Sequence, residues 1–346
     1  MPRGKVRFAS EARSQIALKA QITYNEHLVK SQGKIRYTNK GQFQAMHIVI
    51  IRKSRKSPAF ILPVIFIGFT AVLLALSPAL SAEDIYAGLK LKLIQGGFSP
   101  QQVASVFKPT PPPMFKLVSQ TLRVREGQLN YDHFLAPSEI AQARTFILKH
   151  QGSFQRAERA YGVESGVIAA ILLVETHFGS YTGRTLTLAV FSTFAIMDQK
   201  SNRDRIWKLI SPQDRERLGR EAFDRKLLDR SEWAYKELSA LLEWGRTHHV
   251  RPEMFTGSVM GAIGLPQFLP SSLIEYGVDG NGDGLIDLYD PDDAIFSTAN
   301  YLRGHGWCEA RFPTDQEQVI WTYNHSKPYV RTVLEIAERL KAETVQ

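Results

Sequence analysis

The feature that most constrains this chain is an uninterrupted apolar run, Val167–Val174, which ends at Glu175. We expect this run to form a helix with the glutamate at its end. Partial burial makes a carboxyl group hold its proton more tightly, and a carboxylic acid that stays protonated near neutral pH can act as a general acid. The simpler interpretation is an ordinary helix-end glutamate that meets water, with Gly179 terminating the helix.

Most of the positive charge lies at the beginning of the chain. The formal net charge is +9 over 346 residues, but residues 1–56 hold thirteen Lys and Arg against two Glu, and the remainder carries −2. The high isoelectric point is therefore not evidence of a nucleic-acid-binding surface. A basic arm that binds nucleic acid is the alternative, but the next segment favours export, so we expect no nucleic-acid partner.

Residues 57–82 carry no charge and directly follow four Lys and Arg within residues 52–56. A positive segment, an apolar stretch and a small-residue end are typical of a signal peptide. We expect cleavage near Ala82 or Glu83 and a periplasmic protein. The alternative is an uncleaved inner-membrane anchor facing the periplasm, because the stretch is long enough to span a bilayer. In both cases this segment is the expected membrane contact.

Signal peptides seldom begin so far into a chain. Met46 would make a conventional start, so residues 1–45 fit an upstream extension of the reading frame. Residues 83–346 are the expected catalytic domain. Cys308 is the sole cysteine, which excludes an intrachain disulfide, and the exported part is long enough to bury a core without one.

Helical patterns dominate the exported part. Ser99–Gln102 fits a helix start, with a serine cap and a proline in the first turn. Residues 108–113 and 257–291, rich in Pro or in Gly and Asp, are expected to be mostly extended or loop. Apolar residues recur at helical spacing over 140–161, 203–247, 294–305 and 329–343. Strand signals are sparse, so we predict a mainly α (α+β) fold with a small irregular or β part.

Residues 279–290 match the twelve-residue calcium loop of EF-hands, in which oxygen ligands alternate along the chain. Gly284 falls at the sharp turn. Asp290 stands where a longer glutamate usually supplies two oxygens, which predicts a weaker or reshaped site. We expect a structural Ca²⁺ and no organic cofactor; the alternative is an Asp/Gly-rich turn without metal. The predicted ligands are Asp279, Asn281, Asp283, the Leu285 carbonyl, Asp287 and Asp290.

Three segments stand in unbroken order around this loop. They are residues 161–163 leading into 175–179, residues 257–272 followed by the loop and 290–294, and Tyr323–Asn324 with Tyr329 shortly after. Together they resemble the lytic murein transglycosylase B family, which cleaves bacterial peptidoglycan, over roughly residues 85–340. The resemblance implies a lysozyme-like helical catalytic core with a small irregular or β subdomain.

The resemblance also implies the reaction and its residues. Glu175 would be the catalytic acid/base that cleaves the β-1,4 bond between N-acetylmuramic acid and N-acetylglucosamine, leaving a 1,6-anhydro-muramyl end. An Arg-Arg pair frequent in the family is absent, and Lys200 or Arg203 would have to substitute. The residues placed around the sugar subsites are Ser258, Gln267, Tyr301, Tyr323, Asn324 and Tyr329.

Two other functions stay open at this point. A lysozyme-type hydrolase would use the same acid with an activated water, and Asp198 or Asp204 as the second carboxylate. A non-enzymatic, calcium-stabilised wall-binding protein would bind glycan strands without releasing fragments.

The subsite residues have simpler interpretations as well. Ser258, Gln267 and Asn324 would cap loops if they do not contact sugar. Tyr301 and Tyr329 would fill the core.

Overall fold

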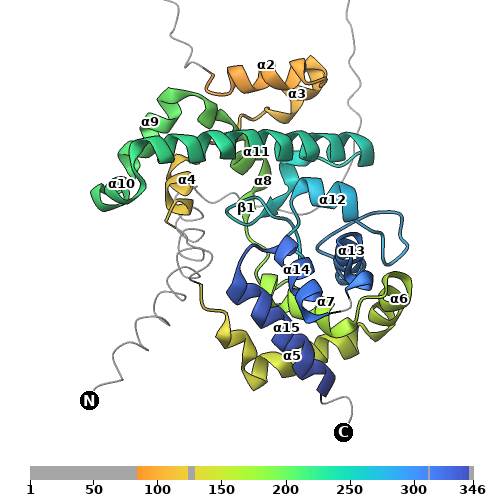
Figure 1. Ribbon diagram of the computed structural model, residues 1–346. Helices are drawn as coiled ribbons and strands as arrows, with labels where there is room; N and C mark the ends of the chain where they lie inside the picture. The colour runs from red at the N-terminus through yellow and green to blue at the C-terminus, as the bar shows by residue number, and fades with distance from the viewer. Residues whose placement is uncertain (1–83, 124–128, 311, 343–346) are drawn as a thin grey trace, which may run out of the picture. The chain divides into compact units, whose positions relative to one another are not determined.

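In the computed structural model, which describes residues 84–123, 129–310 and 312–342, the apolar run forms α7 (Ser165–Thr176). Every residue of Val167–Val174 is at most 8% exposed. A helix that is apolar on all sides must be surrounded by other elements. The surrounding helices include α15 (Lys327–Ala342) and α5 (Pro137–Lys149), which lie beside α7 in Figure 1. The predicted core helix is confirmed.

A second layer is built on α8 (Thr187–Ala195), which is also buried along its whole length. The long helix α11 (Arg220–His248) packs across α8, as Figure 1 shows. Trp233 of α11 meets the ring of Phe191 edge-on at 5.5 Å between centroids. This aromatic contact contributes to the packing of the two helices.

The remaining helices are shorter, and the described residues from Ile85 onward belong to one compact unit. The α-helices are α2 (Ala87–Gln95), α3 (Pro100–Val106), α4 (Phe115–Thr121), α6 (Gln151–Tyr161), α9 (Lys200–Leu209), α10 (Pro212–Leu218), α12 (Pro270–Tyr276), α13 (Pro291–Gly304) and α14 (Pro313–Tyr323). The 3₁₀ helices are η2 (Asp132–Leu135), η3 (Ile196–Asp198), η4 (Pro252–Met254) and η5 (Trp307–Glu309).

The sheet of the described residues has two very short strands, β1 (Thr185–Leu186) and β2 (Thr256–Gly257), paired antiparallel. Two isolated bridges, Gly257 with Ile263 and Ile263 with Phe268, extend the pairing into the loop that follows β2. The prediction of a mainly helical fold with a small β part is therefore confirmed.

Several local predictions hold and others need correction. Ser99 caps α3 as expected, because its Oγ accepts a hydrogen bond from the Gln102 N–H at 3.1 Å. The helical pattern over 140–161 is divided into α5 and α6 at His150. The segment 257–291 is mostly loop but contains α12, which begins with a proline and was not predicted.

The end of α7 also differs from expectation. His177, not Gly179, is the residue in left-handed conformation that ends the helix, with φ of 47°. The N–H groups of His177 and Phe178 donate to the carbonyls of Leu173 and Leu172, which satisfies carbonyls at the helix end.

The predicted basic segment 1–56 and the predicted signal or anchor at 57–82 lie outside the described residues. Among the helices that the structure describes, none is both long and apolar enough to cross a membrane.

Candidate active site around Glu175

Glu175 is the penultimate residue of α7 and its side chain is half-buried. Its Oε1 accepts a hydrogen bond of 2.7 Å from the hydroxyl of Tyr329, on the first turn of α15. Tyr329 is 1% exposed, so this bond to a carboxylate is shielded from water. The packing of α15 on α7 thus fixes one oxygen of the predicted acid.

Tyr329 is the first of a row of three tyrosine rings that contact one another. Tyr323, the last residue of α14, stacks on Tyr329 at 6.5 Å between centroids with an interplanar angle of 12°. Tyr301 of α13 meets Tyr323 edge-on at 4.8 Å. The structure therefore brings three of the predicted subsite residues into one cluster with Glu175.

The hydroxyl groups of this row stay protonated over a wide pH range. Burial raises the pKa of Tyr329 and of Tyr323 well above the ordinary value, and the negative charge of Glu175 adds to the effect. Burial also raises the pKa of Tyr301. The Tyr323 hydroxyl donates to the Pro266 carbonyl at 2.6 Å. Each hydroxyl is consequently a hydrogen-bond donor at neutral pH.

A second connection joins α7 to the loop after β2. The Thr176 hydroxyl donates to the Leu265 carbonyl at 2.9 Å and accepts the Gly179 N–H at 3.0 Å. Gly264 has φ of 72°, and a Cβ placed there would lie 2.4 Å from the Leu288 backbone oxygen. Only glycine lets the loop approach Leu288 so closely at this φ, so the site depends on Gly264.

The polar subsite residues from this loop have structural partners. Gln267 has φ of 53°, and its Nε2 donates to the carbonyls of Gly264 at 2.9 Å and Thr182 at 3.2 Å. Its amide therefore joins the loop after β2 to the segment after α7.

Ser258 and Asn324 hold turns of the backbone. Ser258 Oγ accepts the N–H groups of Met260 at 3.2 Å and Ala262 at 3.1 Å. Asn324 follows α14 as its C-terminal cap residue, and its carbonyl accepts the Ser326 N–H at 2.7 Å. These bonds support the loop-capping interpretation of Ser258; they leave sugar contact by either residue as a prediction.

The structure adds two residues that the sequence did not indicate. Tyr131 meets the ring of Tyr329 edge-on at 5.7 Å between centroids. Glu139 of α5 places its Oε2 3.5 Å from Nε2 of His177, which follows the end of α7. Both contacts join residues that are distant in the chain or lie outside any motif, so no local pattern could have revealed them.

Asp204, one of the two proposed second carboxylates, and both substitutes for the Arg pair have other partners. Asp204 pairs with Lys200 at 2.8 Å and with Arg220 at 2.5 Å, and these hydrogen bonds, that of Lys200 first, lower its pKa. Arg203 pairs with Asp224 at 2.9 Å and donates to the Asp198 carbonyl at 2.7 Å. Arg203 therefore joins α9 to α11, whereas the ion pair of Lys200 lies within α9.

The predicted calcium loop follows α12 and leads into α13. Asp279 Oδ1 accepts the Gly282 N–H at 2.6 Å, and its Oδ2 accepts the Gly284 N–H at 2.8 Å. Gly284 has φ of 88°, which confirms the turn expected there. Four further predicted ligands also accept backbone N–H groups close in sequence: Asn281, Asp283 and Asp287 within the loop, and Asp290, whose Oδ1 caps α13.

Asp293, in the first turn of α13 and three positions beyond the twelve-residue template, is a further acid that binds this loop. It is 1% exposed and accepts the N–H groups of Gly280 at 2.8 Å and Asp287 at 2.7 Å, and its burial raises its pKa. Over the described part of the chain, no three His, Cys, Asp or Glu side chains are arranged to hold a metal ion. The calcium site stays a prediction.

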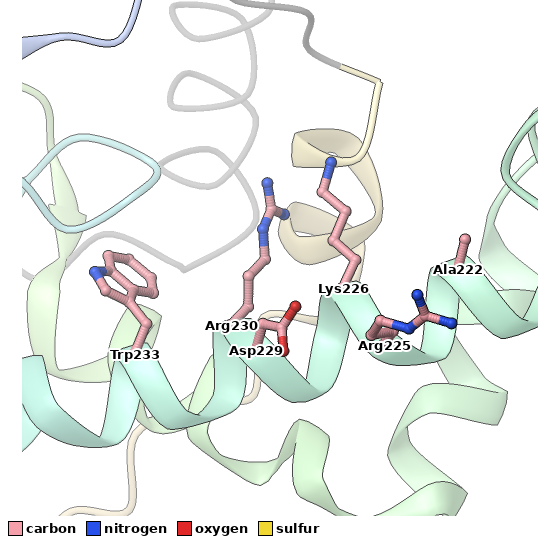
Figure 2. A pocket seen from close by; sticks show the side chains of 6 residues that line it. All are labelled: Ala222, Arg225, Lys226, Asp229, Arg230 and Trp233. Atoms are coloured by element: carbon pink, nitrogen blue, oxygen red, sulfur yellow. The ribbon is translucent and has the colours of Figure 1, made fainter. Parts of the chain in front are cut away.

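A cationic groove of about 400 Å³ lies along α11, away from these motifs (Figure 2). Burial, with the charges of Arg230 and Arg217, lowers the pKa of Lys226. Arg230 donates to the Thr121 hydroxyl at 2.8 Å, so the groove belongs to the packing of α11 on α4. The residues that line it are Ala222, Arg225, Lys226, Asp229, Arg230 and Trp233.

Comparisons with known proteins agree with this architecture. The Membrane-bound lytic murein transglycosylase B of Escherichia coli is 33% identical over 174 residues, which are 50% of this chain and 40% of the relative. The chain thus matches less than half the length of that relative.

Two solved structures show the same fold. The crystal structure of the soluble lytic transglycosylase SltB1 from Pseudomonas aeruginosa aligns with a TM-score of 0.59 and 25% identity, covering 75% of this chain and 99% of that one. The Escherichia coli lytic transglycosylase Slt35 in complex with calcium aligns with a TM-score of 0.58 and 22% identity, covering 76% and 94%. The model of the Transglycosylase SLT domain family matches residues 81–313, so the chain belongs to this family.

Proposed function

We propose that this chain is a peptidoglycan lytic transglycosylase. It cleaves the β-1,4 bond between N-acetylmuramic acid and N-acetylglucosamine and leaves a 1,6-anhydro-muramyl end. The observation that carries this proposal is Glu175 at the end of a buried helix, with Oε1 bound by the Tyr329 hydroxyl at 2.7 Å. Membership of the transglycosylase family and the resemblance around the tyrosine row support it.

The first step is protonation of the leaving group. Glu175 gives its proton to the glycosidic oxygen, the bond from that oxygen to C1 of muramic acid breaks, and N-acetylglucosamine leaves with a hydroxyl group. The N-acetyl oxygen of the same muramic acid stabilises the positive charge at C1. A general acid placed in this way contributes about 10²–10⁴-fold to the rate.

The second step closes a ring. Glu175, now ionised, takes the proton of the C6 hydroxyl, and O6 forms a bond to C1. The acid is thereby regenerated, and no water is consumed. Because O6 belongs to the same sugar, the attack has the advantage of an intramolecular nucleophile. Tyr329 keeps the carboxyl group oriented through both steps, since its raised pKa leaves it protonated.

The alternative hydrolase needs a second carboxylate close to the acid. Of the two candidates from the sequence, Asp204 is bound by Lys200 and Arg220, and Asp198 is exposed at the end of η3. The two ion pairs of Asp204 favour the route that uses one carboxylate.

Replacement of the acid tests the proposal. Glu175→Gln keeps the shape of the side chain but cannot donate and then accept a proton, so we expect turnover of peptidoglycan to fall by at least ~10²-fold. Glu232→Gln, a change at an exposed position of α11, is the matched control. A folded Glu175→Gln variant that releases fragments as fast as this control would remove Glu175 from the reaction.

We also propose that the loop at 279–290 holds Ca²⁺, with Asp279, Asn281, Asp283, Asp287, Asp290 and the Leu285 carbonyl as ligands. Carboxylate, amide and carbonyl oxygens suit this hard cation. The Leu288 carbonyl within the loop accepts the Leu265 N–H at 2.8 Å, and Leu265 in turn binds Thr176. A bound cation would therefore stiffen the segment that supports the end of α7.

For the N-terminus we propose export by residues 57–82, with residues 83–346 as the catalytic domain in the periplasm and glycan strands as its partner. A mature chain that begins near Ala82 or Glu83 would reflect cleavage, and an intact segment would be an inner-membrane anchor. N-terminal sequencing of the protein from its native envelope separates the two. Recovery of the full chain from the cytosol would contradict export.

A further inference from the structure

A cavity of about 440 Å³ lies between residues 129–132 and the beginning of α15. Tyr131 lines this cavity, and its ring also meets Tyr329, the residue that binds Glu175. Tyr131 therefore lines the cavity and also contacts the catalytic cluster. A ligand group in the cavity would lie one aromatic ring away from the tyrosine that orients the acid.

The charged residues of the cavity are Asp132, Lys327 and Arg331. Arg331 Nη2 binds Asp132 Oδ1 at 2.9 Å, so these two charges compensate each other. Lys327 is exposed, and no salt bridge joins it to an acid among the residues that the structure describes. Among the described residues, the cavity therefore has one uncompensated positive charge, that of Lys327, four residues before Arg331 on the same face of α15.

The position of Lys327 is unfavourable for its own helix. It is the first residue of α15, whose first turn contains no acidic residue. The amino end of a helix carries a partial positive charge, which favours acidic rather than basic side chains there. Helix stability does not explain a lysine at this place, whereas an anionic ligand in the cavity would benefit from both positive charges.

We infer that this cavity binds a carboxylate of the peptide stem of the substrate, with Lys327 as the residue that recognises it. The inference rests on the proposed function. The stem is joined to the lactyl group of the muramic acid whose C1 reacts, so its carboxylates are the anionic groups nearest to the acid. The acetamido and hydroxyl groups of the sugars are neutral and give Lys327 no charged partner.

The test compares two ligands that differ only in charge. The probe is a 1,6-anhydro disaccharide–tetrapeptide, which is not cleaved further, with its stem carboxylates either free or converted to amides. We expect the wild-type chain to bind the free acid up to about fivefold more tightly, as an ion pair with an exposed lysine would give. The preference should decrease between 0.05 and 0.5 M salt, because ions screen exposed charges.

In Lys327→Glu this preference should disappear or reverse, whereas Lys327→Arg should retain it. Lys341→Glu makes the same change at the far end of α15, about 21 Å away along the helix axis, and should bind as the wild type does. Lys327→Glu should not lower the melting temperature, since an acidic residue suits a helix amino end.

Equal affinity of the wild type for the two fragments, or an undiminished preference in Lys327→Glu, would overturn the inference. The binding measurement involves no turnover. Loss of activity in Glu175→Gln tests the proposed reaction separately, so either idea can fail while the other stands.

Discussion

Replacement of Tyr329 by phenylalanine isolates the contact on which the catalytic cluster depends. Tyr329→Phe removes the hydroxyl that binds Glu175 Oε1 at 2.7 Å but keeps the buried ring. The contacts of that ring with Tyr323 at 6.5 Å and Tyr131 at 5.7 Å should persist. The variant therefore tests the hydrogen bond and not the packing.

The expected loss of rate follows from the charge of the acceptor, the Glu175 carboxylate. A hydrogen bond to a charged group contributes about 1.5–3 kcal/mol. If this bond holds the carboxyl group in its reactive orientation, its loss raises the barrier by a similar amount, which corresponds to about 10–150-fold in rate. We expect the loss in kcat, with KM little changed, because the hydroxyl binds the acid rather than the sugar.

The assay is the initial rate of fragment release from purified peptidoglycan at several substrate concentrations. Tyr235→Phe is the matched control: it removes a hydroxyl of α11 that donates to the Lys92 carbonyl at 3.1 Å and is not part of the catalytic cluster. The reasoning is refuted if a folded Tyr329→Phe keeps the kcat of this control.

Three further predictions follow from the same geometry. Ca²⁺ at about 100 times its Kd should stabilise the metal-stripped protein by about 2.7 kcal/mol, which raises Tm by several degrees. The double variant Asp279→Ala with Asp283→Ala should abolish this rise. If calorimetry shows no calcium-dependent change in Tm of the wild type, the site is contradicted. Folding raises the pKa values of Tyr323 and Tyr329. Below pH 10 both hydroxyls are protonated whether the chain is folded or unfolded. Above pH 10 they ionise in the unfolded chain but stay protonated in the folded one. The unfolding free energy should therefore fall above pH 10 by up to about 1.36 kcal/mol per pH unit for each, with a shallower fall in Tyr329→Phe; an unchanged slope in denaturant titrations would contradict this. Gly264→Ala should lower both Tm and activity, since its Cβ would lie 2.4 Å from the Leu288 oxygen at φ of 72°, and a normal melting curve would show that the loop can move away.

Features determined by neighbouring residues could be predicted from the sequence. The run Val167–Val174 is apolar on every side of a helix, and Ser99 with its following proline has the side chains that a helix start needs. The break at His150 and the short helix α12 were not predicted, because a helical pattern can continue across a kink and a seven-residue helix in a Gly- and Pro-rich segment leaves little periodicity.

The candidate site likewise contains some features that the sequence could predict and others that it could not. The apolar run and the resemblance predicted Glu175 as a site residue, and the resemblance predicted Tyr329, but their hydrogen bond joins residues 154 positions apart, which no local pattern encodes. Tyr131 and Asp293 were missed for related reasons: one depends on a distant ring, and the other lies beyond the metal template. Gln267 was expected at a sugar subsite, and the structure reveals that its amide joins the segment after α7 to the loop after β2.

Mass spectrometry of the fragments released from purified peptidoglycan tests the central proposal most directly. If Glu175 acts alone and O6 of muramic acid attacks C1, the new ends are 1,6-anhydro-muramyl groups, each lighter by one water than a reducing end, and Glu175→Gln yields almost none. Fragments with reducing ends would establish a hydrolase with a second carboxylate instead. Binding to peptidoglycan without any release of fragments would contradict an enzymatic function altogether.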